Sequence, residues 1–138
     1  MTGLLTRWVP EPLVVLATAV RVEVLLHTTD LPTACRRLGV VLDVRTAVRH
    51  PPEPAELPRW ARAPARWTDV LLGRWPFGDT CLRRCLVLGS RLRGLDPVLR
   101  LGARRTGSGA IVAHAWLEIA GRSLDGTLGD VGPFEALA

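Results

Sequence analysis

The chain has 138 residues, 48% of them hydrophobic and 22% charged, which is enough for one domain with a buried core and excludes an intrinsically disordered protein. The formal net charge is +5, and all 18 basic residues are arginine. These arginines are mixed with 13 acidic residues along the chain, and they form no motif in which aromatic and basic residues alternate. We therefore expect no nucleic-acid partner. They form either an ordinary solvated surface or a surface that attracts an acidic peptide or partner protein.

Residue usage also limits the chemistry. Lys, Asn, Gln and Tyr are absent, which indicates the coding bias of a GC-rich bacterial genome. No Asn can therefore orient a catalytic histidine, and no Gln side chain can stabilise an oxyanion, so these roles fall to Asp, Glu and backbone N–H groups. Three cysteines are too few for a disulfide framework, and reduced thiols indicate a cytoplasmic protein.

The N-terminal part of the chain is expected to be helical. Arg7, Glu11 and two prolines precede any apolar run, so we expect no signal peptide. Apolar residues from Leu13 to about His27 predict a helix. Residues 13–26 span only 14 positions and contain two charges, whereas a membrane span needs about 20 residues. We interpret this stretch as a buried or interface helix in preference to peripheral membrane contact.

Turn signals divide the following part of the chain. The sequence around Asp30 predicts a short helix at 32–38, and residues 40–48 fit either a helix or a strand. Five prolines between residues 50 and 64 predict an extended loop.

This loop divides the chain into an N-terminal helical segment with its linker, residues 1–64, and a C-terminal region, residues 65–138, that carries the candidate functional residues. The two parts are expected to form one compact domain.

The C-terminal half is predicted to contain helices followed by antiparallel strands. A short helix is expected at 65–72, and a rigid turn at 75–78 precedes a helix from about 80 to 93, which stops at Gly94. Strands are expected at 98–104, 110–119 and 122–124. This order predicts an α+β fold.

Cys81 lies in the first turn of the helix expected at 80–93. First-turn N–H groups have no intrahelical acceptor, and with the helix dipole they lower the pKa of a thiol and stabilise an oxyanion. Cys85 lies one turn later and packs behind Cys81, and Cys35 is expected in the core. A metal site of the two helical cysteines and His114 would lack a fourth ligand and the two-residue spacing common for zinc. We therefore expect neither a metal nor another cofactor.

His114 lies on the strand expected at 110–119, 33 residues after Cys81. Strand alternation places His114 on one face together with Trp116 and Glu118. The opposite face is apolar and is expected to be the core face: Ala113, Ala115, Leu117 and Ile119. An imidazole beside a thiolate acts as general base and acid, so this order of residues predicts a cysteine hydrolase.

A third group is expected to orient the imidazole. Asp125 follows His114 by 11 residues, after a turn and a short strand, and can return beside the ring. Asp130 and Glu118 are alternative orienting groups. The sequence predicts a Cys–His–Asp triad of Cys81, His114 and Asp125.

The same residues carry a resemblance to a known family. The segment Cys81-Leu-Arg-Arg-Cys-Leu-Val-Leu, the strand Val98-Leu-Arg-Leu-Gly102, the segment Ala113-His-Ala-Trp-Leu-Glu118 and Gly121 resemble the lasso-peptide maturation proteases. These are transglutaminase-like, papain-related cysteine peptidases of ribosomal peptide biosynthesis. The strong match covers residues 80–125. The N-terminal apolar helix, residues 38–40 and Pro133-Phe134 are also similar to the stand-alone form of the family.

The resemblance implies the fold and the roles of the residues. The fold would be a transglutaminase-like domain in which an N-terminal helical segment precedes a catalytic cysteine, at a helix N-terminus packed against a small antiparallel sheet. Cys81 would be the nucleophile, His114 the general base and acid, and an Asp the orienting group. The chain departs from the family at Cys85, where Ser is frequent, and at Gly126, which occupies the frequent position of the third acid.

The resemblance also implies the substrate and partners. The substrate would be a lasso-peptide precursor from which a leader peptide is removed. A separate leader-recognition protein would present the leader, and an ATP-dependent cyclase would then close the ring. Two other functions remain open: a non-catalytic transglutaminase-like scaffold, and an acyltransferase that uses the same triad.

Overall fold

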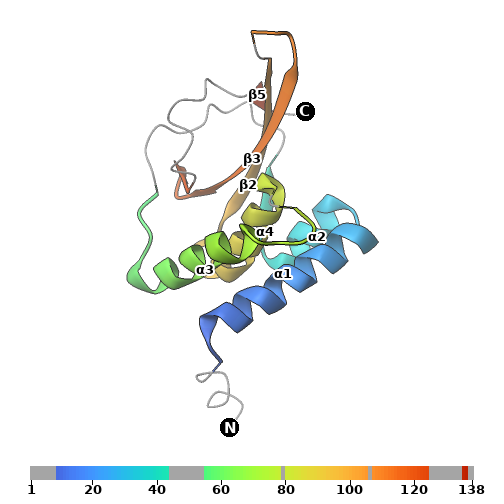
Figure 1. Ribbon diagram of the computed structural model, residues 1–138. Coiled ribbons are helices and arrows are strands. Elements are labelled where there is room, and N and C mark those ends of the chain that lie inside the picture. The colour runs from blue at the N-terminus through green and yellow to red at the C-terminus, as the bar shows by residue number, and fades with distance from the viewer. Residues whose placement is uncertain (1–8, 44–54, 79, 106, 125–134, 137–138) are drawn as a thin grey trace.

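The computed structural model describes residues 9–43, 55–78, 80–105, 107–124 and 135–136. The helices are α1 (Glu11–Thr28), α2 (Leu31–Leu38), α3 (Arg62–Leu72) and α4 (Cys81–Arg91), with short 3-10 turns η2 (Arg59–Ala61) and η3 (Arg93–Leu95). The strands are β1 (Val41–Asp43), β2 (Val98–Arg105), β3 (Ile111–Ile119), β4 (Arg122–Ser123) and β5 (Glu135–Ala136). The helices gather around one end of the β2–β3 hairpin, and the other end of the hairpin extends away from them (Figure 1).

The strands form one mixed sheet in the order β1-β2-β3-β4, with β5 also paired to β2. The β2–β3, β3–β4 and β2–β5 pairs are antiparallel, whereas β1 is parallel to β2. The α+β fold class is therefore confirmed. The expectation of a purely antiparallel sheet is wrong at β1. This three-residue strand comes from residues 40–48, whose pattern fits either a helix or a strand and so did not predict its pairing.

Helix boundaries follow local capping chemistry. Asp30 caps α2 by accepting a hydrogen bond from the backbone N–H of Thr33 at 2.8 Å, and Gly39 ends α2 in a left-handed conformation with φ +76°. The hydroxyl of Thr80 caps α4 by accepting from the backbone N–H of Arg83 at 3.2 Å. The start of α4 is thus fixed immediately before Cys81.

Two predicted boundaries are wrong. α3 begins at Arg62 and not after Pro64, because a proline in the first turn of a helix lacks only an N–H group that has no acceptor there. α4 ends at Arg91, and Gly94 lies in the 3-10 turn η3 instead of stopping the helix.

α1 has a buried face and an exposed apolar face. Val15, Ala19 and Val22 are buried, and the helix packs against α3 and α4. Leu13 and Val20 are 54% and 49% exposed on the other side. Among the described residues, no helix combines the length and the apolarity that crossing a membrane requires.

α4 packs between α1 and the sheet, and its approach to the sheet is close at Gly89. A Cβ atom on Gly89 would lie 2.8 Å from Cγ2 of Val40 and 3.4 Å from Cδ2 of Leu117. Leu86 and Val87 of the same helix are fully buried in the core. The absence of a side chain at Gly89 therefore allows the helix that begins with Cys81 to lie directly on β3.

Replacing Gly89 by valine should force α4 away from the sheet. Overpacking of a buried site of this kind costs about 1–3 kcal/mol, so we expect the free energy of unfolding in urea to fall by that amount. Gly94→Ala is the matched control, because no atom lies within 4 Å of a Cβ added there. Equal unfolding midpoints for both variants would contradict the close packing at Gly89.

Candidate active site

The thiol of Cys81 lies at the edge of β3 that pairs with β4. Among the described residues, β4 pairs with β3 at Glu118 and Ile119, and a hydrogen bond from Leu124 N to Leu117 O extends this pairing by one step. Beyond that step, the backbone N–H of Ala115 donates to Sγ of Cys81 at 3.4 Å. The first residue of α4 therefore takes the place of a neighbouring strand at this point of the sheet.

His114 precedes Ala115 on β3, and its side chain forms a hydrogen bond with Cys81. The residue is half-buried and lies opposite Gly102 in the β2–β3 register. Its ring is nearly parallel to that of Trp116, with centroids 5.9 Å apart and an interplanar angle of 14°. The structure thus brings together the two residues that the sequence proposes as nucleophile and base.

The surroundings of Cys81 favour its thiolate. The hydrogen bond with His114 is the largest influence and lowers the pKa of the Cys81 thiol, while partial burial opposes it. The backbone N–H of Ala115, the charge of His114 and the backbone N–H of Leu82 lower this pKa further. Burial instead raises the pKa of Cys35 to about 11. Cys35 is a core residue as expected, and Cys85 is also buried, one turn behind Cys81.

The strand face that carries His114 is more buried than the sequence indicated. Trp116 is 1% exposed and Glu118 is 4% exposed, so both faces of this part of β3 are buried. The Glu118 carboxylate accepts a hydrogen bond from Nε of Arg100 at 2.8 Å, and Nε1 of Trp116 donates to it at 3.4 Å. Arg100 also forms an ion pair with Asp43 at 2.7 Å, which links β1, β2 and β3. The expectation that only the opposite face is core is therefore wrong.

The position of the orienting acid is only partly described. Asp125 and Asp130 lie outside the described residues. Glu118 is described, but its carboxylate is held by Arg100, and the ring of Trp116 comes between Glu118 and His114 along the strand face.

Sequence reasoning missed one charged residue near the site, Glu23 of α1. Its carboxylate is buried and accepts hydrogen bonds from the indole N–H of Trp75 and from the guanidinium of Arg83. Glu23 follows Ala19 by four residues, and this helical spacing places both on the buried face of α1. From the sequence alone, the charge of Glu23 served only as an argument against a membrane span.

Comparison with known families identifies the type of domain. The profile of the transglutaminase-like superfamily matches residues 25–138. The chain belongs to this superfamily. No curated protein and no solved structure matches it.

The transglutaminase-like superfamily includes cysteine peptidases and acyltransferases. In this transglutaminase-like chain a thiol of lowered pKa, an adjacent imidazole and the start of a helix converge, and these groups suit acyl transfer through a thioester. Within the described residues, no three His, Cys, Asp or Glu side chains cluster as they would around a metal ion.

Cys81 should react with iodoacetamide faster than Cys35 or Cys85 at pH 6.5. An ordinary thiol has a pKa of about 8.5 and is mostly protonated there, whereas the lowered pKa of Cys81 leaves more of its reactive thiolate. Peptide mass spectrometry after timed labelling measures all three rates in one sample. His114→Ala should slow the labelling of Cys81 and leave Cys35 unaffected. Equal rates for the three cysteines of the parent would contradict activation of Cys81.

Proposed function

We propose that this protein is a cysteine peptidase that removes the leader peptide from a ribosomally made lasso-peptide precursor in the bacterial cytoplasm. The observation that carries the proposal is the contact between Cys81, at the start of α4, and His114 of β3 in a transglutaminase-like chain. The resemblance of the segments around both residues to lasso-peptide maturation proteases supplies the substrate.

In the proposed reaction, the Cys81 thiolate attacks the carbonyl carbon at the junction of leader and core peptide. The negative charge on the carbonyl oxygen is stabilised by backbone N–H groups at the start of α4, which have no intrahelical acceptor. Protonated His114 gives its proton to the departing amine of the core peptide, and the C–N bond breaks. Neutral His114 then takes a proton from water, whose oxygen attacks the thioester and releases the leader acid and the thiol.

We assign the orienting role to Asp125. The proposal is supported by the position of Asp125 after β4, the strand that returns alongside β3 and leads the chain back towards His114. Glu118 is the weaker candidate because its carboxylate already binds Arg100. Asp130 is the remaining alternative.

We further propose that a separate leader-recognition protein presents the precursor, and that the ATP-dependent cyclase receives the cleaved core peptide. The exposed apolar face of α1 supports a docking role, because it includes four large aliphatic side chains along one side of the helix: Leu13, Leu16, Val20 and Val24. A chain of 138 residues also offers little further surface for gripping a long leader.

Cys81→Ala and His114→Ala should each lower cleavage of the precursor by more than about a thousand-fold, because members of a catalytic triad act as a unit. Asp125→Ala should cost less, about ten- to a hundred-fold, because an orienting group is partly replaceable. Mass spectrometry of the precursor, incubated with the recognition protein, measures each rate. Cys85→Ala is the control and should keep the parental rate.

Four outcomes would change the assignment. If Asp125→Ala is fully active and either Asp130→Ala or Glu118→Ala is inactive, the orienting role belongs to the residue whose variant is inactive. A leader product joined to an added amine would indicate an acyltransferase. Binding of the precursor without any product, in the presence of the recognition protein, would indicate a scaffold. Loss of activity in a chelator, restored by zinc, would indicate a metal enzyme.

The isolated chain should cleave a dilute precursor weakly, and the recognition protein should stimulate it strongly by raising the local concentration of the scissile bond. A large excess of precursor should therefore partly replace the recognition protein. The double variant Leu13→Glu/Val20→Glu should reduce the stimulation and leave cleavage at high precursor concentration unchanged. Val70→Glu, at an apolar residue of α3 that is 47% exposed, is the control. Full activity of the isolated chain at low precursor concentration would contradict dependence on a partner.

A further inference from the structure

A buried carboxylate of α1 contacts both sides of the segment that carries Cys81. Glu23 is 7% exposed. Nε1 of Trp75 donates to Oε1 of Glu23 at 2.9 Å, Nε of Arg83 donates to the same oxygen, and Nη2 of Arg83 lies 3.4 Å from Oε2. Trp75 precedes Cys81 by six residues and Arg83 follows it by two. One side chain therefore joins the turn before the candidate nucleophile to the helical turn that contains it.

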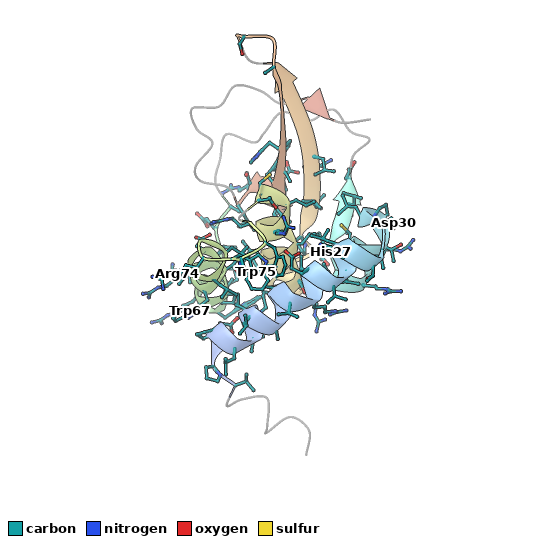
Figure 2. All side chains as sticks on the ribbon, turned by 45° about the vertical axis from the view of Figure 1, so that its right-hand side comes forward. His27, Asp30, Trp67, Arg74 and Trp75 are labelled. Carbon is teal, nitrogen blue, oxygen red and sulfur yellow. The ribbon has the colours of Figure 1, made fainter. Side chains whose placement is uncertain are left out.

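The contact extends to the cap of α4. Nη1 of Arg83 lies 3.4 Å from the hydroxyl oxygen of Thr80, and the backbone N–H of Arg83 donates to that same oxygen. Trp75 lies close to α1, whereas the neighbouring Arg74 points outwards beyond α3 (Figure 2). The cap, the first turn of α4 and the preceding Trp75 are thus connected through Glu23.

The Glu23 carboxylate is ionised in this setting. Burial by itself would raise the pKa of Glu23, but hydrogen bonds from Arg83 and Trp75 and the charges of Arg83 and His27 hold it below its ordinary value. His27, on the same helix, approaches Oε2 with its Nδ1 atom at 3.6 Å. The described polar partners of the Glu23 carboxylate are therefore Trp75, Arg83 and His27.

A second ion pair joins the same two helices away from Cys81. Arg91, the last residue of α4, donates to both carboxylate oxygens of Glu11 on α1, at 2.7 and 3.0 Å. Apolar residues of α1 and α4 also share one hydrophobic core. α1 and α4 are therefore held together independently of Glu23. The contacts of Glu23 add a further attachment, and it lies at the first turn of α4.

We propose that Glu23 is a positioning residue for Cys81: through Arg83 and Trp75 it holds the start of α4 at the edge of β3, where Sγ meets His114 and the Ala115 N–H. The proposal rests on the proposed function, because it assumes that Cys81 is the nucleophile. Glu23 touches no reacting atom. Its effect is expected in the reactivity of the thiol and in the rate of the chemical step, and not in the affinity for the peptide.

Glu23→Gln tests the proposal, because glutamine keeps the size of the side chain and one acceptor but removes the charge that holds Arg83. We expect the rate constant for alkylation of Cys81 by iodoacetamide at pH 6.5 to fall about ten-fold, as the thiolate loses its fixed contacts with His114 and Ala115. The midpoint of the pH–rate profile should rise by about one unit. In precursor cleavage, kcat should fall and KM should stay within about two-fold.

Glu11→Gln is the matched control, since it breaks the other ion pair between the same helices. It should leave the alkylation rate of Cys81 within about two-fold of the parent, whatever its effect on the melting temperature. Glu23→Asp keeps the charge and should recover part of the rate. Trp75→Phe removes a single donor and serves if Glu23→Gln does not fold. It should give a smaller loss in the same direction.

The outcomes separate this proposal from the proposed function. If Cys81 of the parent is labelled no faster than Cys85, the thiol is not activated and the proposed function fails together with this inference. If Cys81 of the parent is labelled fast and Glu23→Gln keeps the parental rate and pH profile, only the positioning role is overturned. It is also overturned if Glu11→Gln slows labelling as much, or if neither Glu23→Gln nor Trp75→Phe folds, because the role is then purely structural.

Discussion

The contact between the start of α4 and the edge of β3 is the one on which the candidate site depends. An edge N–H group that is removed from water needs an acceptor, and the Sγ atom of Cys81 accepts a hydrogen bond from the backbone N–H of Ala115. The same contact brings Cys81 to His114, because His114 and Ala115 are neighbours on β3. One arrangement therefore gives the backbone N–H of Ala115 an acceptor and lowers the pKa of the Cys81 thiol.

Several features hold this contact in place from different directions. Gly89 lets α4 lie directly on Leu117, which fixes the distance of the helix from the sheet. The Thr80 cap fixes the residue at which the helix begins. On the other face of β3, the buried carboxylate of Glu118 is compensated by Arg100, which also binds Asp43 of β1. The strand that carries His114 is thus packed on both faces, at Trp116 and at Leu117.

The sequence was sufficient to predict those parts that depend on local chemistry. The turn at 75–78 and the alternating pattern of β3 predicted that a helix and a strand would carry Cys81 and His114, and short-range signals around Asp30 also predicted α2. The parallel strand β1 was not predictable, since three residues at 41–43 carry too little pattern and pair with a strand more than 50 residues away. The burial of Trp116 and the role of Glu23 depend in the same way on partners that are distant in the sequence.

Glu23 shows why a charge within an apolar helix deserves a structural explanation. Placing an ionised carboxylate in the interior costs free energy unless hydrogen-bond donors surround it. A leucine at the position of Glu23 would avoid this cost. The donors that compensate this charge come from Trp75 and Arg83, on either side of Cys81, and the residues on the opposite face of α1 are exposed and apolar. α1 therefore has an exposed apolar face on one side and contacts the turn that carries the candidate nucleophile on the other. The proposed partner would bind the outer face of the same helix whose inner face contacts Arg83.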